Sequence, residues 1–185
     1  NAVALTTTIE AGFGSRLWAA GFFLNNQLTD FSFRPRDGSG RPIANRVGPG
    51  KRPRSSMSPT IVLDGSGMPL IVTGSPGGAR IIPYVVKAAV AMIDWQLDPS
   101  AAAALPNFAA REDAFIFEQP GTTLREALAN PRRWLGALDT MVRLKAVGQS
   151  TRLETMTSGT HTVRRTRDGL EGGADPRREG LAAGD

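Results

Sequence analysis

The sequence predicts an α+β fold, that is, a layered domain with a mainly antiparallel sheet. Segments with strand character come first, segments with helical spacing follow, and strand-like segments return near the end. Strands and helices do not alternate regularly, as they would in a chain that builds a parallel sheet. With 185 residues and no composition shift that marks a boundary, residues 1–185 are expected to form a single domain with a sizeable core.

The first third of the chain begins with strand formers and continues with polar residues. Residues 2–8 alternate small or polar side chains with apolar ones, which predicts a buried strand. Residues 9–20 are expected to form a loop, and residues 21–24 a short second strand. The polar residues 32–57 predict a long loop, and loops of that length usually have a function or are mobile.

The middle of the chain predicts a hairpin, a glycine turn and a helix. Two apolar runs at residues 59–63 and 69–72 flank the turn sequence DGSG, which is typical of a β-hairpin. The glycine-rich sequence TGSPGG follows at residues 73–78, and helical spacing continues over residues 81–95. Such a turn presents backbone N–H groups at a helix start, where negative charge is stabilised. It suits an anion site or an oxyanion hole, and a turn needed only for packing is the alternative.

The rest of the chain is predicted to contain three helices, three strands and a loop at its end. The helices are expected at residues 99–104, 124–128 and 133–145. The strands are expected at residues 115–117, 152–156 and 160–165. The tail, residues 172–177, is expected to be a loop because it contains two glycines and a proline.

The composition excludes several kinds of chemistry. The chain has no Cys and a single His, His161, so a disulfide, a thiolate nucleophile and a multi-histidine metal site are excluded. No Lys follows Gly78, so residues 73–78 are not a phosphate-binding P-loop. A nucleophile on this chain would have to be a hydroxyl, an amine or a carboxylate.

The charge and the ends of the chain limit partners and compartment. The net charge is +5, but the arginines are spread along the chain and aromatic residues make up only 6%, so nucleic-acid binding is not expected. No apolar run is long enough to span a membrane. The first residues lack a signal-peptide pattern and an initiating Met, which suggests a piece of a longer precursor.

Four groups of residues are candidates for a functional site, although each alone has a structural explanation as a turn, a cap or a surface charge. They are Thr8 with Glu10, the segment 25–30 with Gln27 and Asp30, Ser55 with Ser56, and the glycine turn at Gly77 and Gly78.

Taken together, these groups resemble the small subunit of the gamma-glutamyltransferase family, also called gamma-glutamyltranspeptidase or glutathione hydrolase. The similarity covers essentially all 185 residues, and its most specific blocks are SSMSPT and TGSPGG. Residues 120–150 match only loosely. The motifs occur in the family order at residues 1–3, 13–15, 24–27, 30–31, 48–49, 51–53, 55–61, 73–78 and 175–177.

The resemblance implies an N-terminal-nucleophile hydrolase fold, a four-layer αββα sandwich, formed by a precursor that cleaves itself. The new N-terminal Thr is the nucleophile, its own α-amine is the general base, and no cofactor or metal takes part. That Thr is expected a short way upstream of Asn1. A large subunit from the same precursor is the expected partner, and it carries the arginine for the substrate carboxylate.

The resemblance also implies roles for the candidate residues. The amides of Gly77 and Gly78 would form the oxyanion hole. Thr8 would hydrogen-bond the nucleophile. The γ-glutamyl substrate would be held by the remaining candidates: its α-ammonium by Gln27 and Asp30, and its α-carboxylate by Ser55 and Ser56.

Glu10 departs from the family pattern, since many members have Asn there. A second carboxylate near Asp30 suits an ammonium group, but it could also indicate an acylase of the cephalosporin or glutaryl type. A basic binding module without catalysis is the third hypothesis. The sequence does not decide between hydrolysis and transfer, nor does it fix the compartment, although family members are often periplasmic or secreted.

Overall fold

The computed structural model describes residues 1–111, 113–121 and 131–184. The chain divides into two compact units. Asn1–Thr6 and Met57–Asp185 make up the core unit, and Thr7–Ser56 make up the loop unit. The expectation of a single domain for residues 1–185 stays a prediction.

The core unit is built on a four-stranded antiparallel sheet with the order β3-β4-β8-β9. The hairpin predicted from the sequence is confirmed, because β3 pairs with β4 and Thr60 lies opposite Thr73. Its turn is closed by the Asp64 carboxylate, which accepts the N–H groups of Ser66 at 2.8 Å and Met68 at 3.0 Å. The strands are β3 (Thr60–Leu63), β4 (Pro69–Gly74), β8 (His161–Arg165) and β9 (Leu170–Ala174).

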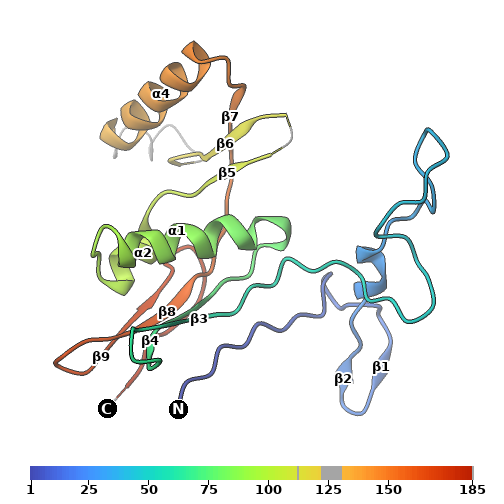
Figure 1. Ribbon diagram of the computed structural model, residues 1–185, viewed down its shortest axis with the longest axis horizontal. Coiled ribbons are helices and arrows are strands. Elements are labelled where there is room, and N and C mark those ends of the chain that lie inside the picture. Colours follow the sequence, from blue (N-terminus) through green and yellow to red (C-terminus); the bar gives the residue numbers. More distant parts are fainter. Residues whose placement is uncertain (112, 122–130, 185) are drawn as a thin grey trace. The chain divides into compact units, whose positions relative to one another are not determined.

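Two helices, α1 (Ile81–Ile93) and α2 (Pro99–Ala104), pack on one face of this sheet (Figure 1). Both were predicted from the sequence. Asp98 caps α2 by accepting the N–H of Ala101 at 2.9 Å. Small side chains allow the helices to approach the sheet closely, and the buried cluster between them consists of Ile71, Ala88, Ala91, Met92 and Ala102.

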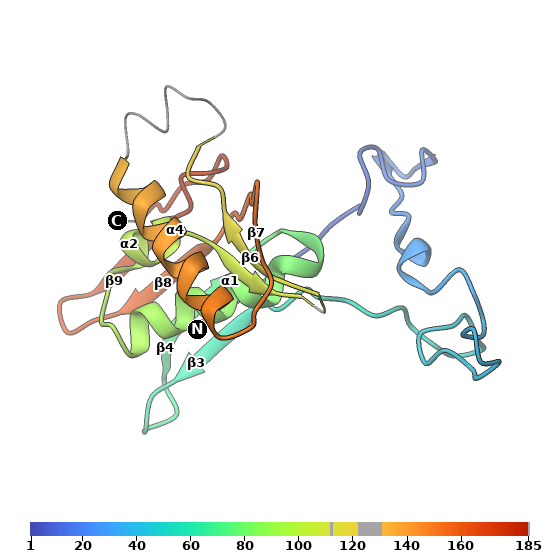
Figure 2. The same ribbon diagram turned by 90° about the horizontal axis from the view of Figure 1, so that it is seen from above.

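A second sheet lies on the other side of α1, with the order β5-β6-β7. A second buried cluster of Tyr84, Ala109, Ile116 and Met156 joins α1 to it. Strand β6 pairs with β7 in parallel, and α4 (Pro131–Ala146), which lies beside β7, occurs between them in the sequence (Figure 2). The strands are β5 (Phe108–Ala110), β6 (Phe115–Glu118) and β7 (Thr151–Glu154).

Two predictions about this unit need correction, and a third is not tested. Strands β6 and β7 are parallel and have α4 between them in the sequence, so they form a βαβ crossover. The sequence analysis looked for a repeated alternation of strands and helices, and this crossover occurs only once. The tail was expected to be a loop, but β9 extends to Ala174. Its glycines reflect close packing, since a Cβ on Gly173 would lie 2.4 Å from the carbonyl carbon of Pro99. The helix predicted at residues 124–128 lies outside the described residues.

The predicted strand at residues 2–8 is also wrong. Residues 1–9 form no helix or strand and pair with no strand in the part of the chain that the structure describes. Burial alternates along residues 1–6, and Val3 and Leu5 are 82% and 81% exposed. The sequence pattern of a strand is therefore present, whereas a partner strand is not.

The face of the four-stranded sheet opposite α1 and α2 is apolar and largely open. Ile61, Val72 and Val163 lie opposite one another in register across β3, β4 and β8. Residues 1–3 line a cleft on this face together with Val72 and Val163. Residues 1–3 therefore lie against part of the face that α1 and α2 leave open.

The loop unit contains little regular structure. The strands β1 (Trp18–Ala19) and β2 (Phe22–Phe23) form a short hairpin, in agreement with the strand predicted at residues 21–24. A 3-10 helix, η1 (Gln27–Asp30), follows. The remaining residues to 56 form the long predicted loop, with isolated bridges between Ser32 and Arg46 and between Arg36 and Pro42.

Candidate active site

The glycine bend connects β4 to α1 through a short 3-10 helix, η2 (Gly78–Arg80). Gly77 has φ 140° and Gly78 has φ 56°, both in the region that residues with a Cβ rarely adopt. A Cβ on Gly77 would lie 2.6 Å from the Tyr84 ring, which is only 1% exposed. A Cβ on Gly78 would meet nothing within 4 Å. Gly77 is thus required for conformation and space, and Gly78 for conformation alone.

The two glycine amides are available as hydrogen-bond donors. Within the described residues, neither the N–H of Gly77 nor that of Gly78 donates to a protein acceptor. The carbonyl of Gly77 accepts the N–H of Arg80 at 3.1 Å, which begins the helical turn. Two adjacent N–H groups at the start of a helix can stabilise an anionic oxygen.

The segment with Thr8 and Glu10 is held close to η1, which carries Gln27 and Asp30. The Thr8 hydroxyl accepts the N–H of Glu10 at 2.8 Å. The side-chain oxygen of Asn26 accepts the N–H of Ala11 at 3.0 Å, and the backbone N–H of Asn26 donates to the carbonyl of Ile9 at 3.3 Å. Asn26 therefore joins two parts of the loop unit that contain four of the predicted site residues.

A second asparagine, Asn45, connects η1 to the segment that leads to Ser55 and Ser56. Its side-chain amide donates to the backbone carbonyl of Asp30 at 2.7 Å, and its side-chain oxygen accepts the N–H of Arg54 at 3.0 Å. Asn26 and Asn45 thus connect the backbone segments of the loop unit that carry or lead to six predicted site residues, namely Thr8, Glu10, Gln27, Asp30, Ser55 and Ser56. Gly77 and Gly78 belong to the core unit.

Sequence reasoning missed the roles of the two asparagines. Asn26 was included only as a member of the candidate segment 25–30, with no role of its own, and Asn45 lies in a polar segment without periodicity. Asparagine has both a donor and an acceptor on its side chain, so one residue can connect two backbone segments. An Asn before a 3-10 turn, and another close to the serine pair, are the signals that could have indicated them.

Glu10 has an unusual backbone, with φ 72°. Asn is enriched among non-glycine residues with such angles, whereas Glu is not. The backbone at position 10 therefore favours Asn over the Glu that this chain has.

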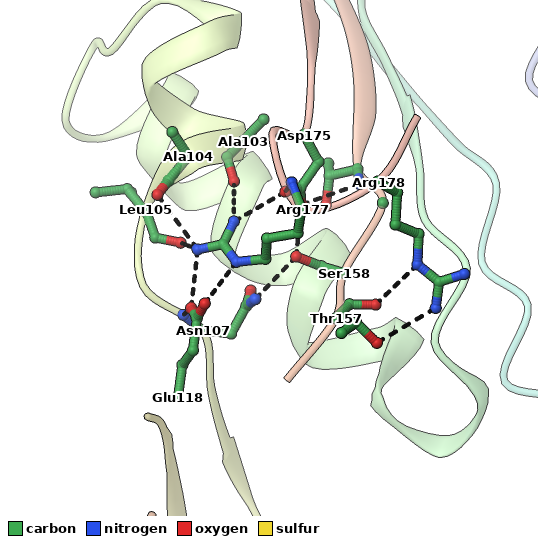
Figure 3. A network of polar contacts seen from close by, with 12 residues as sticks. Ala103, Ala104, Leu105, Asn107, Glu118, Thr157, Ser158, Asp175, Arg177 and Arg178 are labelled. Carbon is green, nitrogen blue, oxygen red and sulfur yellow. Dashed lines mark hydrogen bonds and ion pairs between the residues drawn. The ribbon is translucent and has the colours of Figure 1, made fainter. Parts of the chain in front are cut away.

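A buried network of charged side chains lies in the core unit (Figure 3). The Arg177 guanidinium donates to Glu118 at 2.6 and 2.8 Å and to Asp175 at 2.9 Å. It also donates to the last carbonyls of α2 and the residue after it, at Ala103, Ala104 and Leu105. The network therefore satisfies carbonyls that the end of a helix leaves without partners.

Lys87 of α1 shares this environment, since it donates to the Leu105 carbonyl at 2.8 Å and to the Asn107 side chain at 2.9 Å. Burial lowers the pKa of Lys87 to about 8, and the positive charge of Arg177 contributes to the shift. Burial alone would raise the pKa of Asp175, but the Ser158 hydroxyl and Arg177 outweigh it and hold that pKa below its usual value.

The described residues contain no group of three or more His, Cys, Asp or Glu side chains placed to hold a metal. Among the same residues, no helix has the length and apolar character needed to cross a membrane.

The comparisons with known proteins identify the family. A family model described as Gamma-glutamyltranspeptidase matches residues 1–185, so the chain belongs to the gamma-glutamyltranspeptidase family. It is 39% identical over 184 residues to the glutathione hydrolase proenzyme of Escherichia coli (strain K12), covering 96% of this chain and 29% of that protein. The match to the Bacillus subtilis proenzyme is 41% over 109 residues, covering 58% and 17%. The chain thus spans less than a third of these relatives.

Solved structures confirm the fold class. A Helicobacter pylori gamma-glutamyltranspeptidase mutant superposes with a TM-score of 0.76 at 32% identity, over 96% of this chain and 94% of that one. Gamma-glutamyltranspeptidase from Pseudomonas nitroreducens, complexed with L-DON, gives a TM-score of 0.77 at 28% identity, over 100% and 94%. The α+β fold of the N-terminal-nucleophile hydrolase type, expected from the resemblance, is therefore the fold of this chain.

Proposed function

We propose that the complete protein transfers or hydrolyses γ-glutamyl groups from glutathione and similar amides, by way of a γ-glutamyl–threonine ester. The observation that carries the proposal is the glycine bend, where Gly77 and Gly78 present two unused N–H groups at the start of a helix. Membership of the family supports the same reaction.

The proposed chemistry requires two donors aimed at one oxygen. The hydroxyl of the N-terminal Thr attacks the γ-carbonyl, its α-amine takes the proton, and negative charge develops on the carbonyl oxygen. The N–H groups of Gly77 and Gly78 bind that oxygen, and the leaving amine departs with the proton. Water then hydrolyses the ester, or an acceptor amine takes the γ-glutamyl group. Loss of one such donor typically costs about 2.7–4 kcal/mol of transition-state stabilisation.

The loop unit supplies the clamp for the amino-acid end of the substrate. The carboxylate of Asp30 and the side chain of Gln27 bind the α-ammonium, because a charged acceptor forms the stronger hydrogen bond to a cation. Ser55 and Ser56 bind the α-carboxylate. Asn45 supports this arrangement, since it connects the backbone of Asp30 to the segment before the serines.

Thr8 and Glu10 complete the proposed site. Thr8 hydrogen-bonds the nucleophile, and the carboxylate of Glu10 adds negative charge near the ammonium. The N–H of Glu10 donates to the Thr8 hydroxyl at 2.8 Å, so the two residues are positioned together.

The large subunit of the same precursor is the proposed partner of this chain. The apolar row of Ile61, Val72 and Val163 and the side chains of Val3 and Leu5 are available for it. A sheet of the large subunit that packs on this face would remove its apolar surface from water, and such burial is the main driving force of association.

The test measures turnover of γ-glutamyl-p-nitroanilide by the complete protein and by residues 1–185 alone. The complete protein is expected to be active. The chain alone is expected to be inactive, because loss of a nucleophile typically lowers the rate by about 10⁶. In the complete protein, Asp30→Ala should raise KM strongly. Activity of residues 1–185 above a mock preparation, or an unchanged KM in the variant, would contradict these roles.

A further inference from the structure

We propose that Ser75 is a positioning residue for the oxyanion hole, because its hydroxyl fixes the peptide plane that carries the Gly77 N–H. This inference rests on the proposed function, since it concerns how the same site is held ready. Ser75 contacts neither the substrate nor the nucleophile in this role, and acts only through the Pro76–Gly77 peptide.

The Ser75 side chain is buried, with 2% exposure, and both of its hydrogen-bonding directions are used. Its hydroxyl donates to the Pro76 carbonyl at 2.8 Å and accepts the N–H of Gly159 at 3.2 Å. Because a backbone N–H can only donate, the hydroxyl proton is committed to the Pro76 carbonyl.

Fixing the Pro76 carbonyl also fixes the direction of the Gly77 N–H. The peptide is trans, so its C=O and N–H point to opposite sides of the chain. A glycine has little intrinsic barrier to adopting other angles, so the plane before Gly77 would otherwise rotate readily. A rotated plane would present a carbonyl oxygen where the reaction needs a donor.

The second donor is held in a different way. The plane between Gly77 and Gly78 is fixed by the backbone bond from the Arg80 N–H to the Gly77 carbonyl at 3.1 Å. One donor is therefore fixed by a side chain and the other by the backbone. Only the first can be removed by a substitution that leaves the glycines in place.

Ser75 is itself held by the buried network of the C-terminal strands. Its partner Gly159 packs against the Pro76 ring, since a Cβ on Gly159 would lie 2.8 Å from the Cγ of Pro76. On one side of Gly159, Ser158 donates to the Asp175 carboxylate at 2.5 Å (Figure 3). On the other side, the Thr160 N–H donates to the same carboxylate oxygen at 3.3 Å. Asp175 thereby fixes residues 158–160, and Gly159 within this segment donates the hydrogen bond to Ser75.

The experiment compares Ser75→Ala with a matched control in the complete protein. Thr162→Val is the control, because it also removes a buried hydroxyl that donates to a backbone carbonyl, that of Val72 at 3.2 Å. Ser75→Ala should lower kcat for γ-glutamyl-p-nitroanilide by about 10- to 100-fold, less than the full loss of a donor, with KM unchanged. Thr162→Val should leave kcat unchanged, and both variants should have similar thermal midpoints.

Two further variants keep the test decisive. Ser75→Thr retains the hydroxyl and should recover most of kcat. Ser75→Cys has a similar size and a weaker donor, and should give an intermediate kcat even where the alanine variant fails to mature.

The possible outcomes separate the two proposals. If the complete wild-type protein does not turn over γ-glutamyl substrates, the proposed function is wrong and the role of Ser75 falls with it. If the wild type is active and Ser75→Ala matches Thr162→Val in kcat, or changes only KM, the role of Ser75 alone is wrong.

Discussion

Replacing the two glycines of the bend separately by alanine tests both the conformation and the proposed role of the bend. The structure predicts very different results for neighbouring positions. At Gly77 a new methyl group would lie 2.6 Å from the buried Tyr84 ring, and the backbone has φ 140°. At Gly78 the methyl group would meet nothing within 4 Å, and φ is 56°.

The magnitudes follow from these environments. Gly77→Ala combines backbone strain of about 1–3 kcal/mol with overpacking against Tyr84 of about 1–3 kcal/mol. Gly78→Ala should lower the free energy of unfolding only by the cost of placing a residue with a Cβ in the left-handed conformation, about 1–2 kcal/mol. If the bend around Gly77 shifts to relieve the contact, its N–H leaves the oxyanion position and kcat falls by about 10²–10³. For Gly78→Ala we expect kcat to fall by less than about tenfold, or 1.4 kcal/mol.

Two measurements on the complete protein check this comparison. Urea denaturation gives the change in the free energy of unfolding, which does not depend on the proposed function. Steady-state turnover of γ-glutamyl-p-nitroanilide gives kcat. Equal stability of the two variants would refute the packing argument at Gly77, and a normal kcat for Gly77→Ala would refute its place in the oxyanion hole.

Further predictions concern the asparagine bridge, Glu10 and the buried network. Asn45→Ala should raise KM for γ-glutamyl-p-nitroanilide with little change in kcat, because it frees the backbone of Asp30; an unchanged KM would contradict this. Glu10→Asn should raise the free energy of unfolding, measured in urea, by about 1 kcal/mol, since Asn adopts φ 72° more readily than Glu. Glu10→Gln should give no such increase. Both variants remove the carboxylate, so both should shift the ratio of rates on γ-glutamyl and glutaryl anilides. Arg177→Ala should lower the free energy of unfolding by about 3–5 kcal/mol, since it leaves buried carboxylates unpaired, and a loss below 1 kcal/mol would count against it. The pKa of Lys87 is lowered to about 8 from 10.5, so the unfolded chain binds more protons between these values and stability should rise with pH there; Lys87→Gln, measured in urea at several pH values, should abolish this rise.

The parts of the fold that depend on local signals could be predicted from the sequence. The hairpin β3–β4 follows from two apolar runs around a DGSG turn, and α1 from apolar spacing after the glycine bend. Strand β9 was missed because Gly172 and Gly173 indicate a turn when considered locally. A Cβ on Gly173 would meet Pro99 of α2 and one on Gly172 would meet Ala182, and no local pattern contains these tertiary contacts.

In the candidate site, too, local signals could be found in the sequence and tertiary contacts could not. The resemblance identified the glycines and the polar residues, but not the contacts that hold them. Asn26, Asn45 and Ser75 act through hydrogen bonds to distant or adjacent backbone groups, and their sequence neighbours give no periodic signal. The conformation of Glu10 could not be foreseen either, because φ at one residue depends on the turn around it.

The contacts of Arg177 have a consequence for how the protein is made. The carbonyls at the end of α2 and the charge of Glu118 are satisfied by a side chain more than fifty positions later in the chain. The ribosome adds Arg177 only after all of these groups, so the core unit cannot complete its folding while the earlier segments are being synthesised. We expect nascent chains that stop short of Arg177 to remain accessible to proteases and chaperones, and those that include it to become resistant.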